Sequence, residues 1–165
     1  MAHITFGGNP ANTIGELPAV GTQAPDFTLT DKDLNTRSLG EFKGSKVVLN
    51  VFPSVNTGVC AASVRKFNEE AGKLDNTKVL CISKDLPFAQ AQFCGAEGIE
   101  NVEMLSDYKT GDFGRDYGLA MADTAFETLH SRVVMALDEN GKVLYSEQVP
   151  EIGQEPNYQA ALDAL

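Results

Sequence analysis

The sequence predicts an α/β fold with a central mixed β-sheet and helices on both of its faces. Short apolar runs rich in β-branched residues alternate with segments whose apolar residues recur at helical spacing. Two late apolar runs are joined by Asp138-Glu139-Asn140-Gly141, which is a hairpin signal. No linker, repeat or low-complexity stretch divides the 165 residues, so we expect one domain, residues 1–165.

The first third of the chain predicts peripheral strands followed by one buried strand. Residues 4–6 (ITF) and 27–39 (FTLTDKDLNTRSL) indicate short, solvent-facing strands and turns. Residues 46–52 (KVVLNVF) form an apolar run between Gly44 and Pro53, as a buried strand does. The first buried strand is therefore expected at residues 46–52.

The centre of the chain alternates helices and strands. Apolar residues recur at helical spacing over residues 59–72 and predict the first helix. Residues 78–83 (KVLCIS) predict a strand, 87–98 (PFAQAQFCGAEG) a short helix with proline at its start and glycine at its end, and 102–107 (VEMLSD) a further strand. This order favours parallel strands connected by helices.

The last third predicts a short helix or turn at residues 111–118 (GDFGRDYG), a strand hairpin at 132–149, and a closing helix at 157–165. Between the first two of these segments, Leu119, Met121 and Phe126 are candidates for the core. The hairpin adds strands to the sheet, which makes it mixed rather than purely parallel.

Composition excludes several classes of function. The formal net charge of −10 disfavours nucleic acid and anionic membrane surfaces as partners, because both would repel the chain. No apolar run approaches the length of a membrane span, and the opening MAHITFGGNP is too polar for an export signal. Three cysteines form no disulfide framework. We therefore expect a reducing compartment and a cytoplasmic location.

The three cysteines occupy different predicted environments. Cys60, in PSVNTGVCAASVRKF, follows a strand and lies in the first turn of a helix, where free amides and the helix dipole stabilise a thiolate. It is the candidate nucleophile. Cys81 lies inside an apolar strand and is expected to serve packing only. The spacing leaves open whether Cys94 packs in the core or forms a redox pair with Cys60.

Other functions of a reactive cysteine place different demands on the surrounding sequence. Arg65 follows Cys60 one residue closer than the arginine of a phosphatase loop, and no histidine precedes the cysteine. A redox sensor would use the same thiol without turnover, whereas a thioredoxin-type dithiol enzyme needs a C-x-x-C motif that is absent. His3 and His130 are expected to be ordinary polar positions, and no metal or cofactor motif is present.

The stretch PSVNTGVC resembles the peroxiredoxin signature P-x-x-x-T-x-x-C. Its continuation CAASVRKF and the downstream CISKDLPFAQAQFCGAEG are similar to the thiol peroxidase subfamily, the atypical two-cysteine peroxiredoxins. The resemblance extends from ITFGGNP to EPNYQAALDAL. It implies a thioredoxin-like fold with an N-terminal β extension, a homodimer, and reduction of hydrogen peroxide and organic hydroperoxides in antioxidant defence. Thioredoxin would be the reductant, and no metal, heme or flavin would be needed.

The resemblance also implies roles for five residues. Cys60 matches the peroxidatic cysteine, which would become a sulfenic acid, and Cys94 matches the resolving cysteine, which would form an intrachain disulfide with it. Thr57 and Pro53 match the signature loop, and Arg132 matches an arginine that precedes an apolar strand. Judged by their positions alone, Thr57 could cap the helix, Pro53 could only shape the loop, and Arg132 could be a surface residue.

Two further expectations follow from the resemblance. Asn56 stands where close relatives carry an acidic residue, outside the signature positions, so it would tune the loop or the dimer surface. If Cys60 opens one helix and Cys94 lies within another, a disulfide requires that residues 87–98 rearrange, because bonded cysteines have Cα atoms within about 7 Å. The segment before Arg132 would contribute to the dimer and to the surroundings of the substrate.

Overall fold

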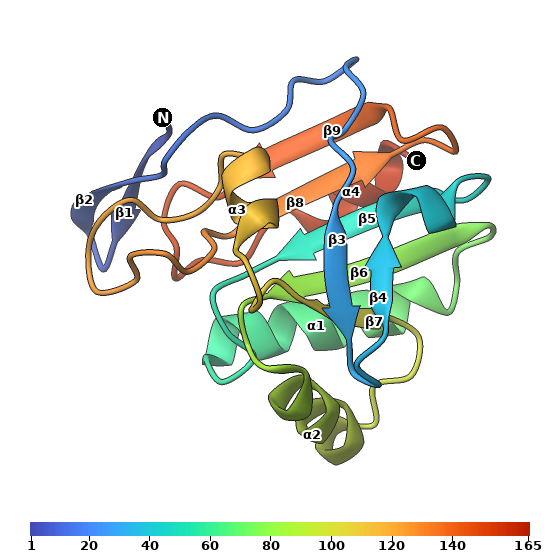
Figure 1. The fold of residues 1–165 in the computed structure, drawn as a ribbon. Coiled ribbons are helices and arrows are strands. Elements are labelled where there is room, and N and C mark those ends of the chain that lie inside the picture. The colour runs from blue at the N-terminus through green and yellow to red at the C-terminus, as the bar shows by residue number, and fades with distance from the viewer.

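The computed structural model describes residues 1–165 and has a seven-stranded sheet with a separate two-stranded hairpin (Figure 1). The strand order in the large sheet is β4-β3-β7-β6-β5-β8-β9. Its strands are β3 (Thr28–Asp31), β4 (Thr36–Ser38), β5 (Lys46–Val51), β6 (Thr77–Ser83), β7 (Glu103–Ser106), β8 (Val133–Leu137) and β9 (Val143–Gln148). The hairpin pairs β1 (His3–Phe6) with β2 (Asn9–Asn12).

The helices lie on both faces of this sheet, as the sequence predicts. They are the 3-10 helix η1 (Leu39–Phe42) and the α-helices α1 (Gly58–Ala71), α2 (Pro87–Glu97), α3 (Asp112–Asp116) and α4 (Tyr158–Asp163). One buried cluster packs the sheet against α1, α2 and α4, and a second packs its other face against η1 and α3. None of the helices is long and apolar enough to cross a membrane.

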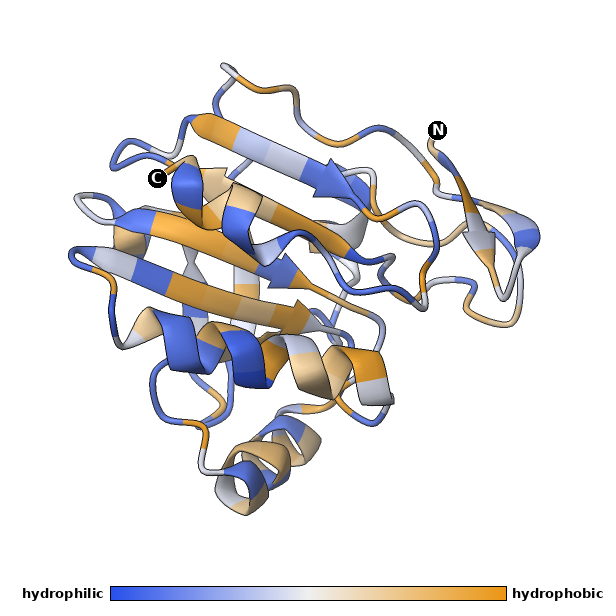
Figure 2. Cartoon of the chain, turned by 180° about the vertical axis from the view of Figure 1, so that it is seen from behind, coloured by the Kyte–Doolittle hydropathy of each residue, from blue (hydrophilic) through white to orange (hydrophobic).

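The central strands β5, β6 and β7 are parallel and are connected by α1 and α2. In the register of β5 and β6, Val51 lies opposite Ile82, so the two strands end side by side where both helices begin (Figure 1). Seen from behind, these strands are largely apolar, whereas α1 is hydrophilic mainly in its second half (Figure 2). Buried parallel strands and a half-exposed helix account for both patterns.

The predicted boundaries in the centre and the last third of the chain are confirmed within about two residues, which is the usual scatter of element ends. The helix α2 ends at Gly98, whose φ of 67° is the left-handed conformation that glycine adopts without strain. The segment 111–118 contains a helix, α3, and Asp138 to Gly141 connect β8 and β9. Leu119 and Met121 lie in buried clusters, whereas Phe126 is only partly buried.

The expectation of solvent-facing strands in residues 27–39 is wrong for β3. Leu29, Thr30 and Asp31 are buried, because β3 pairs with β4 on one side and with β7 on the other. The short run TLTD does not reveal this, since its polar residues look exposed until a neighbouring strand from much later in the chain covers them.

The N-terminal β extension is a hairpin docked on the chain beyond β9. The Thr5 amide donates to the Pro150 carbonyl at 2.8 Å, and the Ile152 amide donates to the Thr5 carbonyl at 3.0 Å. Glu151 accepts from the Thr5 hydroxyl and the Gly8 amide, which fixes the turn of the hairpin. The hairpin therefore lies close to the last loop of the protein, near the end of the sheet that carries Arg132.

Candidate functional site

The predicted nucleophile lies at the start of α1, as the sequence indicates. The helix begins at Gly58, with Thr57 in the N-cap position, so Cys60 is in its first turn. The Cys60 side chain is fully buried. The loop from Phe52 to Thr57 carries the chain from the end of β5 into this helix, at the edge where open α/β sheets bind their ligands.

Arg132 contacts the sulfur of Cys60 directly. Its Nη2 donates to Cys60 Sγ at 3.2 Å, and its Nε donates to the Ile152 carbonyl at 2.8 Å. The arginine is 3% exposed and stands immediately before β8, the antiparallel neighbour of β5. A permanent cation at hydrogen-bonding distance stabilises a thiolate. The alternative of a surface arginine is therefore wrong.

One donor of this guanidinium is left free. Nη1 of Arg132 is buried and has no hydrogen-bond partner. A buried unpaired donor on a charged group is costly, so such groups normally have a partner when the protein works. Arg132 also lines a cavity of about 300 Å³. The guanidinium thus donates to the Cys60 sulfur through Nη2, and its Nη1 remains available to donate to a ligand.

The cavity beside Arg132 brings together further predicted residues. Pro53 and Thr57 line it, together with Phe6 of β1 and Phe126. The two phenylalanine rings meet edge to face with their centroids 4.6 Å apart. Phe126, from the segment before Arg132, thus forms part of the cavity wall. A mostly apolar cavity with one free cationic donor suits a small, weakly polar ligand.

Thr57 does not cap α1 with its side chain. Its hydroxyl donates to the Ser54 carbonyl at 3.2 Å, and no helix amide donates to it. The hydroxyl oxygen keeps its lone pairs for another donor, and the group lies on the cavity wall. Asn56, the position that departs from the family pattern, is exposed and is not part of that wall.

Cys94 lies apart from this cavity. Its side chain is almost fully buried in α2 and lines a different cavity of about 340 Å³ beside the β3–β4 hairpin. Burial raises the pKa of the Cys94 thiol, and Lys32 offsets part of that rise. All three cysteines are free. Four of the five predicted site residues therefore meet at one place, and Cys94 does not.

Cys81 behaves as the packing residue that its apolar strand predicts. It is fully buried, and burial raises the pKa of its thiol to about 12. Its sulfur accepts one hydrogen bond, from Asn50 Nδ2 at 3.6 Å. A thiol held this firmly in its protonated form is a poor nucleophile.

The arrangement of Arg65 disfavours the phosphatase-like alternative. Its guanidinium is half-exposed and lies 3.6 Å from Glu97 on α2, pairing the two helices. The cation beside Cys60 is Arg132, which comes from a distant part of the chain.

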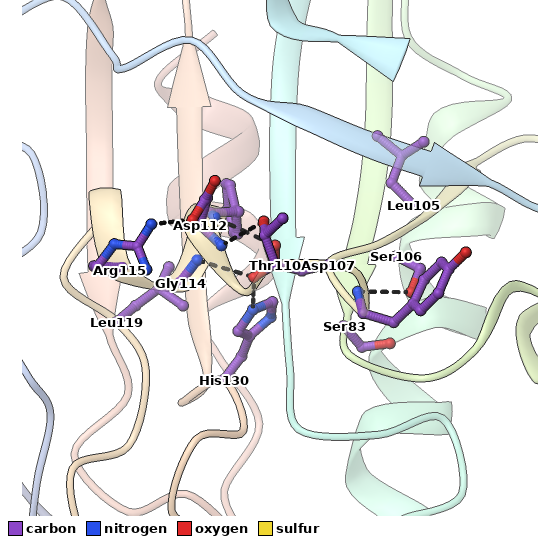
Figure 3. A network of polar contacts seen from close by, with 12 residues as sticks. Ser83, Leu105, Ser106, Asp107, Thr110, Asp112, Gly114, Arg115, Leu119 and His130 are labelled. Carbon is purple, nitrogen blue, oxygen red and sulfur yellow. Dashed lines mark hydrogen bonds and ion pairs between the residues drawn. The ribbon is translucent and has the colours of Figure 1, made fainter. Parts of the chain in front are cut away.

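His130 was expected to be an ordinary polar position, and this is wrong. The ring is fully buried, and its Nε2 lies 2.8 Å from the Asp107 carboxylate (Figure 3). The same carboxylate accepts the Gly114 amide at 3.0 Å at the start of α3. The pair fastens the segment before Arg132 to the loop after β7. Its two members are 23 residues apart, and no local pattern indicates that they meet.

The sequence pattern also did not indicate a carboxylate next to the Cys60 loop or an aromatic residue that packs on α1. Asp85 accepts hydrogen bonds from Ser54 and from the Val55 amide. Tyr158 of α4 packs on Phe67 of α1, and burial raises the pKa of its phenol. An acidic residue two positions after the strand KVLCIS was the available signal for Asp85, because the ends of parallel strands share one edge of the sheet.

Comparison with known proteins agrees with the geometry. A family model described as redoxin matches residues 19–162. Thiol peroxidases of Mycobacterium tuberculosis and Corynebacterium glutamicum are 56% and 53% identical over 165 residues, which is 100% of this chain and 99% of each relative.

Solved structures support the same assignment. A peroxiredoxin-like protein from Aquifex aeolicus superposes with a TM-score of 0.93 at 35% identity, covering 99% of this chain and 95% of its own. A thiol peroxidase from Chromobacterium violaceum gives 0.90 at 21% identity, covering 98% and 93%, which supports the fold. This chain therefore belongs to the redoxin family, as a peroxiredoxin-type enzyme of the thiol peroxidase group with a thioredoxin-like fold.

Proposed function

We propose that the enzyme reduces hydrogen peroxide and organic hydroperoxides with Cys60 as its nucleophile. The observation that supports this most strongly is the contact of 3.2 Å from Arg132 Nη2 to the buried Cys60 sulfur. The Cys60 thiolate attacks one peroxide oxygen, the O–O bond breaks, and the second oxygen leaves as an alkoxide or hydroxide that takes up a proton. Cys60 is oxidised by two electrons to the sulfenic acid.

The groups around the cavity fit the needs of this step. Breaking the O–O bond requires alignment with the sulfur and donors for the charge that develops on the leaving oxygen. The free Nη1 of Arg132 is such a donor, and the Thr57 hydroxyl lies on the same cavity wall. Pro53 contributes no amide and shields the thiolate from water.

Cys94 is proposed to resolve the sulfenic acid. Its sulfur attacks Cys60 Sγ, an intrachain S–S bond forms, and water leaves. Thioredoxin then returns two electrons to the disulfide. Because Cys94 lines a separate cavity, α2 has to move before the two sulfurs meet. Only Pro87, Gln90 and Cys94 of α2 are buried, so little packing opposes this motion.

We further propose that the enzyme works as a homodimer in the cytoplasm, in antioxidant defence. Leu86 and Phe88, at the start of α2, are 51% and 66% exposed, and a second copy of the chain would cover such side chains. Size-exclusion chromatography with light scattering tests the oligomeric state of the wild type. A monomer at all concentrations would contradict it.

The decisive experiment is thioredoxin-coupled peroxide consumption by the wild type, Cys60→Ser and Cys94→Ser. Intact mass is measured after one equivalent of peroxide. We expect no turnover with Cys60→Ser. With Cys94→Ser we expect one event per chain and a mass gain of about one oxygen atom, because the sulfenic acid cannot be resolved. The wild type should instead lose the mass of about two hydrogen atoms and contain the Cys60–Cys94 disulfide.

Two results would contradict the proposal. Turnover by Cys60→Ser would exclude Cys60 as the nucleophile. Stoichiometric oxidation of the wild type without turnover, in the presence of thioredoxin and its reductase, would indicate a sensor rather than a peroxidase.

A further inference from the structure

The two loops that follow β5 and β6 are tied together by one carboxylate. The first loop leads to Cys60, and the second, of three residues, leads from Ser83 into α2. Asp85 lies in the second loop. Its Oδ1 accepts from the Ser54 hydroxyl at 2.6 Å, and its Oδ2 accepts from the Val55 amide at 2.9 Å. Both donors belong to the loop that leads to Cys60.

Asp85 is itself held from its own side. The Ser83 hydroxyl donates to Asp85 Oδ2 at 2.6 Å, and the Ser106 hydroxyl donates to the Asp85 carbonyl. Gln90, fully buried in α2, donates to the Ser83 oxygen at 3.1 Å and to the Leu105 carbonyl at 3.0 Å. The carboxylate therefore has a fixed position between the ends of β6, β7 and α2, and it can serve as an anchor for a neighbouring loop.

Ser54 connects Asp85 to Thr57 through hydrogen bonds. Its hydroxyl oxygen accepts from the Asn56 amide at 3.1 Å while donating to Asp85. Its carbonyl accepts both the Thr57 amide and the Thr57 hydroxyl, each at 3.2 Å. The rotamer of Thr57 thus depends on where the Ser54 carbonyl points. A continuous chain of hydrogen bonds leads from Asp85 through Ser54 to the threonine on the cavity wall.

We propose that Asp85 is a positioning residue for peroxide reduction, acting on Thr57 through Ser54. This rests on the proposed function, in which Thr57 and Cys60 meet the peroxide. Asp85 does not touch the cavity. Through Ser54, Asp85 holds the Thr57 hydroxyl in one orientation, with its proton on the Ser54 carbonyl and its oxygen free to accept a hydrogen bond. The contact between Arg132 and Cys60 does not involve Asp85. The carboxylate should therefore control the rate of reaction with peroxide but not the general reactivity of the thiolate.

The test compares two reactions of the same sulfur in the wild type and Asp85→Asn. Rapid quenching with intact mass gives the rate of Cys60 oxidation by hydrogen peroxide, and peptide mapping gives the rate of Cys60 alkylation by iodoacetamide between pH 4 and 9. An asparagine side chain keeps only one acceptor oxygen. It therefore cannot replace both oxygens of Asp85, which accept from the Ser54 hydroxyl and the Val55 amide. We expect peroxide oxidation to slow by about 10- to 100-fold, since small misplacements of a reacting group have effects of this size. Alkylation and its pH midpoint should change by less than about twofold.

The matched control is Asp138→Asn. Asp138 also accepts two loop amides, from Asn140 and Lys142, but in the distant turn between β8 and β9. We expect it to react with peroxide as the wild type does. If Asp85→Asn does not fold, Ser54→Ala decides instead, because it removes the same bond while keeping the Ser54 carbonyl. We expect it to slow peroxide oxidation by about 5-fold or more.

The possible outcomes distinguish failure of the positioning role of Asp85 from failure of the proposed function. Wild-type protein in which peroxide leaves Cys60 unoxidised would refute the proposed function. A wild type that is oxidised at Cys60, with Asp85→Asn equally fast, would refute only the positioning role. An equal loss in the peroxide and alkylation reactions would also refute it, because that pattern indicates general loosening of the site.

Discussion

Cys60 and Cys94 are both free, both buried and both on helices that follow parallel strands, yet their surroundings are opposite. Cys60 lies in the first turn of α1 with the Arg132 guanidinium on its sulfur. Cys94 lies two turns into α2, where burial raises the pKa of its thiol. The two cysteines therefore differ not in burial but in their position along the helix and in the presence of a contacting cation. These are the two features that stabilise a thiolate.

The largest effect that tests this comparison is expected from Arg132. In Arg132→Ala the sulfur loses its contacting cation and the cavity loses its free donor. We expect the rate of Cys60 oxidation by peroxide to fall by about 100- to 1000-fold, as when a charge-stabilising donor is removed from other active sites. Rapid-quench intact mass measures this rate. Alkylation of Cys94 should stay unchanged, since no contact joins it to Arg132.

Arg65→Ala is the matched control for Arg132, because Arg65 is an arginine of α1 itself but pairs with Glu97 instead of contacting Cys60. Its oxidation rate should match that of the wild type. A loss in Arg65→Ala as large as that in Arg132→Ala would mean that the net charge near the helix, rather than the contact with the sulfur, activates Cys60.

Cys81 extends the comparison of Cys60 and Cys94, because its thiol is buried and no cation contacts it. Its pKa is raised from 9.0 to about 12 in the folded protein. The stability from keeping this thiol protonated is complete below about pH 9 and is lost as the pH rises toward 12, because the unfolded chain ionises first. Between pH 8 and 10.5 the wild type should lose about 2 kcal/mol more free energy of unfolding than Cys81→Ala, roughly 30-fold in the unfolding constant.

Urea unfolding under reducing conditions measures this difference. Tyr117, which is buried, and Tyr158, which is partly buried, also titrate in alkali. Their effects cancel because both residues are present in the wild type and in Cys81→Ala. Parallel pH slopes for the wild type and Cys81→Ala would show that burial of Cys81 does not hold its proton.

The smallest expected effect concerns the mobility of the two helices. Forming the proposed disulfide detaches Cys94 from its packing, so amides of residues 87–98 should exchange at least about 10-fold faster in the oxidised protein, while α1 changes less. Hydrogen exchange with mass spectrometry measures both segments. Cys94→Ser treated with peroxide is the control, since it forms no disulfide. Unchanged exchange in α2 of the oxidised wild type would mean that the sulfurs meet without rearrangement.

The particular residues show which features can be predicted from sequence. The α1 start at Gly58 and the α2 end at Gly98 were predictable because strand-to-helix junctions and C-terminal glycines are local signals. The burial of β3 and the Asp107–His130 pair were not, because each depends on segments far apart in the chain. Arg132 was found only through the family resemblance, since an arginine before a strand has no distinguishing local pattern.

The sequence by itself determined the alternation of strands and helices, the placement of Cys60 in a first helical turn and the packing role of Cys81. These depend on periodicity, caps and apolar runs, which operate over a few residues. Only the tertiary structure decided that Arg132 contacts Cys60, that Cys94 lies in a different cavity, and that Asp85 holds the Cys60 loop. Those contacts join residues brought together by the sheet, and the order of its strands is set by the packing of the whole core rather than by any one segment.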